Sequence, residues 1–274
     1  MTPELGTIGV WRMVRDATPE IAYAVEALGY GALWLGGSPT GDLQAVERLL
    51  DATERIPIAT GIVNMWREPA AQVAASYHRI EEIHPGRLLL GVGIGHPEAT
   101  AEYRDPLEKI DDYLTRLADA GVPRDRQILA ALGPKVLRVA AERTAGAHPY
   151  LTTPVHTALA REVLGDGPLL APEHKVVVGP DAGSARRLGR PIVSRYLGRV
   201  NYRKNLLREG WSDSDLADGG TDALVDALVL HGSPEDVAAG IRRHLEAGAD
   251  HVSIQPLGDD PLTALEELAP LLVG

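Results

Sequence analysis

Short apolar runs alternate with amphipathic stretches along the chain, and this alternation restricts the possible folds more than any other feature. Eight runs have the length and aliphatic composition of buried strands, at residues 8–11, 32–35, 58–63, 88–92, 128–132, 150–152, 176–178 and 251–255. Helical stretches lie between them, and several begin with a capping residue followed by proline, as at Thr18-Pro19 and Ser233-Pro234. Strands that succeed one another through helices pair in parallel, so the pattern predicts an α/β fold, a closed (β/α)8 TIM barrel.

The chain length of 274 residues fits one such barrel, and we expect a single domain over residues 1–274. The spacing is irregular at one place, where some fifty residues separate the seventh strand from the helix that starts after Ser233. This segment, about residues 180–232, carries eight basic side chains at helical spacing and predicts a helical insertion at the substrate-binding face of the barrel. A solvated helical pair or an oligomer contact is the alternative.

The composition argues against several classes of function. A net charge of −11 is unfavourable for nucleic-acid binding, because that binding requires a basic surface. The absence of cysteine excludes disulfides and thiolate metal sites, and no HExxH or comparable cluster occurs, so we expect no metal. The N-terminal residues lack the pattern of a signal peptide and no window approaches eighteen uninterrupted apolar residues. The sequence therefore predicts a cytoplasmic protein with no nucleic-acid or membrane partner.

Three neighbouring predicted strands end in glycine, which suggests a planar ligand at the carboxyl ends of these strands. Strand ends without side chains are what a stacked ring would require, whereas a simple turn needs one glycine. The repeat of glycines at 91, 93 and 95 lacks the spacing and the position of a Rossmann fingerprint. Relief of crowding inside the barrel is the alternative. The predicted cofactor-binding residues at these ends are Gly36, Gly37, Gly61, Ile62, Val63, Asn64, Gly93 and Gly95.

Further polar and aromatic residues follow predicted strand ends. Gly133-Pro134 opens a helix and Gly146-Ala147-His148 precedes the sixth strand, so both segments offer backbone N–H groups to an anion. His96, one residue past the glycine strand end, is the first candidate for proton transfer and His148 is the second, with a structural or solvated histidine as the alternative. Trp66 and Trp11 are expected to line a substrate pocket, and Trp34 is expected in the core.

Four segments resemble the luciferase-like monooxygenase superfamily in the expected order, at residues 30–37, 60–64, 86–95 and 247–252. The resemblance is greatest to its branch of coenzyme F420-dependent oxidoreductases from actinobacteria. It implies a barrel of the bacterial-luciferase-like type, with a non-proline cis peptide at Gly61-Ile62 against which the deazaflavin packs. It also implies contacts to the rest of the cofactor from Ala131, Gly133, Pro134, Gly146, Ala147 and His148.

The activity implied by the resemblance is hydride transfer between coenzyme F420 and a small organic substrate, in a homodimer. Members that oxidise alcohols or sugar phosphates often carry an Asp-His or Glu-His pair after the second strand and a Glu after the fourth. This chain has Gly36-Gly37 and His96 at those places, so the usual acid and base residues are altered. Two alternatives stay open: an FMN-dependent monooxygenase on the same barrel, and a non-catalytic cofactor-binding protein or oligomeric scaffold.

Overall fold

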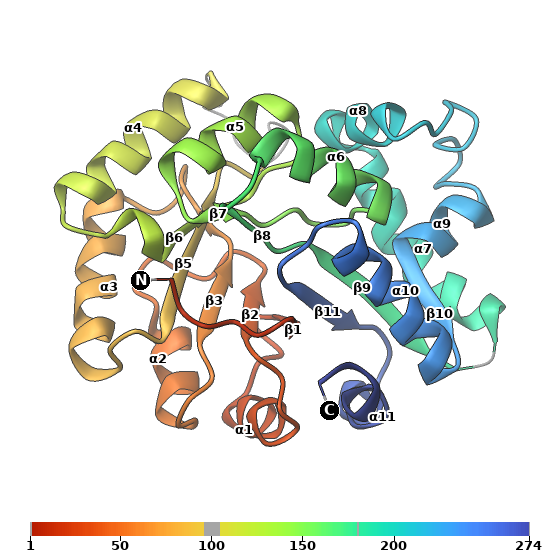
Figure 1. The fold of residues 1–274 in the computed structure, drawn as a ribbon, viewed down its shortest axis with the longest axis horizontal. Coiled ribbons are helices and arrows are strands. Elements are labelled where there is room, and N and C mark those ends of the chain that lie inside the picture. Colours follow the sequence, from red (N-terminus) through yellow and green to blue (C-terminus); the bar gives the residue numbers. More distant parts are fainter. Residues whose placement is uncertain (1, 96–104, 180, 274) are drawn as a thin grey trace.

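The structure, a computed structural model, describes residues 2–95, 105–179 and 181–273 and shows a ring of parallel strands surrounded by helices (Figure 1). The strands are β1 (Ile8–Met13), β2 (Leu33–Gly36), β3 (Ile58–Gly61), β4 (Val63–Asn64), β5 (Leu88–Gly93), β6 (Gln127–Leu129), β7 (Gly146–Ala147), β8 (Leu169–Leu170), β9 (Glu173–Val178), β10 (Val229–Gly232) and β11 (Val252–Pro256). The helices are α1 (Pro19–Ala27), α2 (Gln44–Asp51), α3 (Ala70–Ile83), α4 (Pro106–Asp119), η2 (Arg124–Arg126), α5 (Pro134–Arg143), α6 (Pro154–Leu164), α7 (Ala182–Leu197), α8 (Val200–Arg208), α9 (Asp222–Leu228), α10 (Pro234–Glu246) and α11 (Pro261–Leu272).

The strands form one sheet that closes on itself. Its order is β10-β9-β11-β1-β2-β3-β5-β6-β7-β8, with β4 continuing the edge beside β5. Only Ala171 and Pro172 separate β8 from β9, and this extended segment is hydrogen-bonded on both sides. The N–H of Glu173 donates to the carbonyl of Pro149 at 2.9 Å, and the N–H of Ser253 donates to the carbonyl of Pro172 at 2.9 Å. The predicted fold class, a (β/α)8 barrel with a helical insertion after the seventh strand, is confirmed.

The predicted helix starts are confirmed where a capping residue precedes proline. Thr18 and Thr153 accept hydrogen bonds from backbone N–H groups in the first turns of α1 and α6, each of which begins with proline. At α10, Ser233 and Asp236 form a reciprocal capping box. Such caps satisfy N–H groups that have no partner inside the helix, so each helix begins where the chain leaves the barrel mouth.

The predictions for the sixth and seventh strands need correction. The sixth strand is Gly146–Ala147 and not residues 150–152, because Leu151 has a left-handed backbone with φ of 54° that extended pairing does not allow. The seventh strand position begins at Leu169 and continues to Val178, well before the predicted start at residue 176. The strand β10 was not predicted; it pairs in parallel with the outer end of β9.

The insertion consists of α7, α8 and α9 and leads into β10, to which α7 and α9 are packed (Figure 1). Its buried aliphatic and aromatic residues form a cluster separate from the main core. The eight basic side chains of the insertion are nearly balanced by acidic ones, because residues 181–232 also contain seven acidic side chains. The insertion is therefore close to neutral.

The interior of the barrel is filled by a small cluster distinct from the larger layer between strands and helices. Trp34 is fully buried, as predicted. Within residues 2–95, 105–179 and 181–273 no helix is long and apolar enough to cross a membrane. The buried members of the interior cluster are Leu5, Trp11, Ala32, Trp34, Ala59, Leu89, Ile128 and Ala171.

Candidate functional site

The glycine edge, defined here as the ends of β2, β3 and β5 with Gly36, Gly61 and Gly93, lies at one side of the barrel mouth. Register places Gly36 directly beside Gly61. Gly61 and Ile62 are partly exposed there, and the peptide bond between them is cis, as expected. Of the three glycines of this shelf, only Gly61 is partly exposed, whereas Gly36 and Gly93 are buried.

The space above these glycines is not uniformly empty. A Cβ on Gly36 would lie 1.6 Å from the ring of Trp11, so this ring occupies the space that the missing side chain leaves. A Cβ on Gly93 would lie 2.9 Å from Ala130 and 3.1 Å from Ile62. The expectation that all three strand ends are bare of bulky groups is wrong at Gly36, because β1 supplies an indole in compensation.

Gly61 differs from its neighbours in what faces it. A Cβ there would lie 3.0 Å from the indole Nε1 of Trp11 and 3.0 Å from the imidazole Nε2 of His148. Both nitrogen atoms are buried and have no hydrogen-bond partner among the described residues. Buried polar atoms are nearly always hydrogen-bonded, so two such atoms beside one glycine mark a place where a ligand or water fits.

His148 lies inside the barrel and not in the loops around it. Its Nδ1 is 2.6 Å from the carbonyl oxygen of Ala171, and its ring stacks on Trp34 with centroids 4.1 Å apart. Burial lowers the pKa of His148 to about 4, so the ring is neutral at physiological pH. His251, expected to be structural, receives a hydrogen bond of 2.9 Å from the indole of Trp34 and is fully buried.

The opposite side of the mouth, on β9 and β11, carries a network of charged and aromatic side chains that we call the paired side. Lys175 contacts both carboxylate oxygens of Glu173 at 2.9 and 3.0 Å, and both side chains are fully buried. Its ammonium also lies 3.8 Å from the ring centroid of Tyr150, whose hydroxyl donates to Gln255 at 3.2 Å. The N–H of Leu151 donates to Glu173 at 3.1 Å, so the polar groups of this network have partners.

Burial shifts the pKa values of this pair in opposite directions. It raises the pKa of Glu173 and lowers the pKa of Lys175, because each charge is costly away from water, while the ion pair opposes both shifts. The pair has no net charge in either its ionic or its proton-transferred form. The paired side therefore exerts only a weak electrostatic field on the rest of the mouth.

A helix start lies next to the glycine edge and could receive an anion. Gly133 precedes α5, and a Cβ on it would lie 3.8 Å from the Nη1 of Arg208 at the end of α8. Arg208 is exposed and forms no ion pair with the described residues. Backbone N–H groups at a helix start together with a guanidinium favour a phosphate or carboxylate.

A partly buried carboxyl, that of Glu209, attaches α8 to the barrel close to this helix start. Glu209 accepts hydrogen bonds from Thr153 at 2.6 Å and from Asn205 at 2.7 Å. Burial raises the pKa of Glu209 to about 7. The insertion thus contributes Arg208 to the mouth, and Glu209 fixes the helix that carries it.

The remaining predicted site residues lie around the shelf or behind it. Asn64 accepts a hydrogen bond from the N–H of Trp66 at 2.9 Å and also faces Gly95. Trp66 is partly exposed, with the ammonium of Lys109 at 5.1 Å from its ring centroid. Met13 lies against Gly37, and its methyl carbon is 2.7 Å from the position that a Cβ of Gly37 would occupy. Buried beneath the shelf are Val63, Ala131 and Ala147.

Two further predictions have structural outcomes of their own. A Cβ on Gly146 would lie 1.9 Å from the carbonyl oxygen of Leu169, so this glycine allows β7 and β8 to approach each other. Pro134 occupies the first turn of α5 and is partly exposed next to Gly133. His96, the first candidate for proton transfer, lies outside the described residues.

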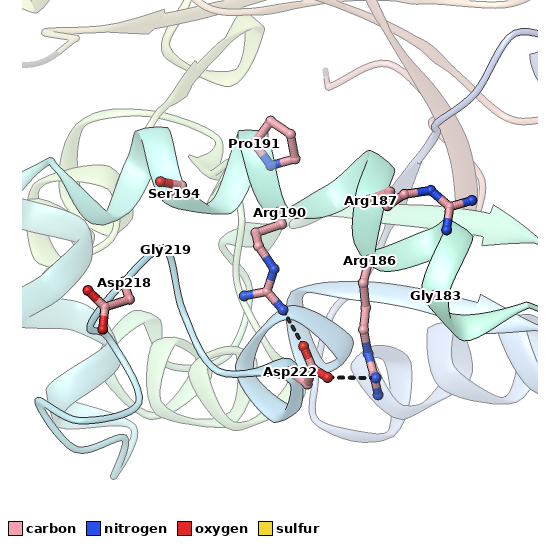
Figure 2. A pocket seen from close by; sticks show the side chains of 9 residues that line it. All are labelled: Gly183, Arg186, Arg187, Arg190, Pro191, Ser194, Asp218, Gly219 and Asp222. Atoms are coloured by element: carbon pink, nitrogen blue, oxygen red, sulfur yellow. Dashed lines mark hydrogen bonds and ion pairs between the residues drawn. The ribbon is translucent and has the colours of Figure 1, made fainter.

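The arginines of α7 line a surface groove of about 550 Å³ on the insertion (Figure 2). Figure 2 shows Arg186 and Arg190 both reaching Asp222, and Arg186 also pairs with Asp226. These guanidinium groups are therefore neutralised within the insertion. The insertion at the substrate-binding face stays a prediction, with a solvated helical pair or an oligomer contact as the alternative.

Sequence reasoning missed the buried charges of the paired side. Glu173 and Lys175 precede the valine run that was taken as the seventh strand, and charged residues before an apolar run are usually outside a strand. Their spacing of two residues places both side chains on the same face of a strand, which was the available signal. No pattern marked Glu209, because it follows a helix that only the fold brings to the mouth.

Comparison with known proteins supports the fold over the full chain and a family over part of it. Residues 3–121 match the family described as luciferase-like monooxygenase. A 5,10-methylenetetrahydromethanopterin reductase of Methanolobus tindarius is 24% identical, with 98% of this chain and 100% of that protein covered. This family match covers less than half of the chain.

Solved structures with this fold include enzymes with two different cofactors. An F420-dependent secondary alcohol dehydrogenase in complex with an F420-acetone adduct has a TM-score of 0.75 at 16% identity, covering 99% of this chain and 98% of that chain. The FMN complex of the oxygenating constituent of 3,6-diketocamphane monooxygenase from Pseudomonas putida has a TM-score of 0.72 at 17% identity, covering 98% and 100%. At such identities the likeness shows the (β/α)8 barrel fold and does not choose between the cofactors.

Proposed function

We propose that this protein is a luciferase-like oxidoreductase that binds the deazaflavin coenzyme F420 at the glycine edge and transfers hydride between it and a small organic molecule. The observation that carries the proposal is the continuity of the glycine edge with the helix start at Gly133. Ile62 and Ala130 both lie next to the position that a Cβ of Gly93 would occupy. Gly133 follows Ala130 by three residues, and the guanidinium of Arg208 lies beside it. A shelf for a flat ring thus adjoins a site for an anion.

The residues of the chain would divide the work of holding such a cofactor. Gly61 and Ile62 would lie against the ring, while the N–H groups at the start of α5 and the guanidinium of Arg208 would bind its anionic part. The deazaflavin would supply the hydride donor and acceptor, which no side chain of the protein can provide. The paired side would keep that half of the mouth dry, because its network needs no water.

Titration of the full chain with F420 and with FMN, followed by ligand fluorescence at low salt, tests the proposal. We expect F420 to bind more tightly, and Arg208→Gln to weaken binding about fivefold to tenfold through loss of a charged contact. Arg203→Gln is the matched control, since Arg203 lies on the same helix and already pairs with Asp213 at 2.8 Å. Absence of F420 binding would overturn the proposal.

FMN-dependent oxygenation is the second candidate, because the FMN-bound structure shares the whole fold. Tighter binding of FMN, with oxygen consumption during turnover, would favour it. Binding of F420 without hydride transfer to any of a panel of alcohols, aldehydes and ketones would favour a cofactor-binding protein. The homodimer implied by the family resemblance stays a prediction, which sedimentation of the full chain would test.

A further inference from the structure

Two tryptophan–histidine pairs lie inside the barrel, and one of them is complete. In the closed pair, the indole N–H of Trp34 donates to Nε2 of His251 at 2.9 Å. The other ring nitrogen of His251, Nδ1, donates to the carbonyl of Gly6 at 2.8 Å. All three nitrogen atoms of this pair are therefore satisfied, and the carbonyl, which can only accept, fixes the tautomer.

The second pair, Trp11 with His148, has the same chemical groups and lacks the bond between them. The carbonyl of Ala171 lies 2.6 Å from Nδ1 of His148, so Nδ1 carries the proton and Nε2 presents a lone pair. The indole N–H of Trp11 is a donor. Neither Nε1 of Trp11 nor Nε2 of His148 has a partner among the described residues, and the two side chains are 3% and 2% exposed.

Both free nitrogen atoms face the same glycine. Each lies 3.0 Å from the position that a Cβ of Gly61 would occupy, so the two atoms are at most about 6 Å apart, a span that one oxygen atom between them can bridge with two hydrogen bonds. Gly61 itself is partly exposed, whereas the two side chains are not. A small group entering past Gly61 would meet both nitrogen atoms at once and lose contact with bulk water.

A donor and an acceptor that converge require a group that both accepts and donates. A hydroxyl oxygen does so, since it can accept from the indole and give its own proton to the imidazole in a hydrogen bond. A carbonyl can only accept and would leave Nε2 of His148 unsatisfied, at the cost of a buried polar atom. An ammonium would leave the indole N–H without an acceptor.

We propose that Trp11 and His148 form a binding site for one hydroxyl group beside Gly61, supplied by an alcohol ligand or by an ordered water molecule. The alcohol source rests on the proposed function, because it places the ligand at the glycine edge. The donor–acceptor pairing rests only on the geometry of Trp11, His148 and Gly61. It adds two ligand-binding residues, Trp11 and His148, to the mouth of the barrel.

Nitrogen NMR of the full chain, labelled with ¹⁵N in tryptophan and histidine and without added cofactor, tests this site. Titration with isopropanol should shift the resonances of Trp11 Nε1 and His148 Nε2 saturably, while acetone should leave His148 Nε2 unmoved. The closed pair, Trp34 and His251, is the control in the same spectrum and should not shift. Phe substitutions of Trp11 and Trp34 assign the two indole signals.

An ordered water gives a different supporting result. The indole N–H of Trp11 would then show cross-relaxation with a long-lived water molecule, and isopropanol would cause no saturable shift. If neither an alcohol shift nor a water cross-peak is found at Trp11 and His148, the proposal is overturned. Equal shifts of both pairs would also overturn it, because they would report a general solvent effect.

Gly61→Ala provides an independent test, since its methyl group would occupy the space that both nitrogen atoms face. It should weaken the isopropanol response of both nitrogen atoms at least tenfold. If this variant fails to fold, Trp11→Phe removes the donor and should reduce the response at His148 Nε2 instead. F420 titration of the same samples separates the two proposals: binding of F420 without a hydroxyl signal overturns only this inference, and the reverse result overturns only the proposed function.

Discussion

The two sides of the barrel mouth treat buried polar groups in opposite ways. On the paired side, Glu173 and Lys175 satisfy each other, and Tyr150 and Gln255 complete the network. Facing the glycine edge at Gly61, His148 keeps one ring nitrogen without a partner among the described residues. Both sides belong to one barrel.

This difference separates scaffold from binding surface. A network in which charge and hydrogen bonds are satisfied is complete without a ligand, so its value lies in rigidity. An edge with unsatisfied nitrogen atoms and missing side chains becomes complete only when something binds. Substitutions should therefore affect folding on the paired side and ligand binding on the glycine edge.

The largest effect is expected from Lys175→Met. It leaves the carboxylate of Glu173 buried without its counter-ion, and the loss of one partner of a buried pair costs about 3–5 kcal/mol. The free energy of unfolding in urea measures this. The double variant Glu173→Leu/Lys175→Met is the control and should recover most of the loss, because no charge stays buried. A single variant as stable as the wild type would contradict the assignment of the paired side as scaffold.

A second effect concerns pH and the two barrel histidines. Burial lowers the pKa values of His148 and His251 to about 4, from 6.5 in the unfolded chain. Since the folded state disfavours the protonated ring, this stability is fully present above pH 6.5 and is lost as the pH falls toward 4. For each histidine, the free energy of unfolding should fall by about 2 kcal/mol between pH 7.5 and pH 5.

Urea unfolding at several pH values tests this expectation. His148→Gln should flatten the stability profile between pH 6.5 and pH 4, and His251→Gln should do the same. An unchanged profile in both variants would mean that other groups cause the acid sensitivity.

Two glycine substitutions compare the filled and the open part of the shelf. Gly36→Ala would place a Cβ 1.6 Å from the ring of Trp11, so the indole must move, and overpacking of this kind costs about 1–3 kcal/mol. The nearest atoms to the Cβ of Gly61→Ala would be the two nitrogen atoms at 3.0 Å, so this substitution should cost less stability. F420 titration should show the reverse order, with the larger loss of affinity in Gly61→Ala. If Gly36→Ala and Gly61→Ala changed stability equally and also F420 affinity equally, the distinction between a filled and an open part of the shelf would be wrong.

The barrel was predictable because its signals are local. The apolar runs and the capping residues before proline predicted six of the eight strand positions and the main helix starts within a few residues, and they predicted only the last three residues of the seventh strand. The sixth strand was misplaced because β7 has only two residues, and the apolar residues that follow it at 150–152 leave the extended conformation at Leu151. So short a strand carries no period that a sequence can reveal.

The position of the glycine edge could be predicted from the sequence, but the side chains that fill the space beside its glycines could not. Sequence shows where side chains are missing, but the ring of Trp11 fills the space at Gly36 from another strand, and only the register of the barrel brings them together. The same holds for Arg208, which reaches Gly133 from a helix 75 residues later in the chain. Contacts between distant segments decide which part of the shelf stays open.

The smallest expected effect compares the two tryptophans directly. Trp34→Phe and Trp11→Phe remove a similar volume from the barrel interior, but only the first breaks a hydrogen bond and leaves Nε2 of His251 buried without a donor. Trp34→Phe should therefore be less stable than Trp11→Phe by about 1 kcal/mol in urea unfolding without ligand. Saturation with a ligand that binds between Trp11 and His148 should reduce this difference in unfolding free energy. The indole N–H of Trp11 then gains a hydrogen bond like the one that Trp34 already has. A difference near zero would show that Trp11 and His148 are already hydrogen-bonded in the free protein, as an ordered water molecule would make them.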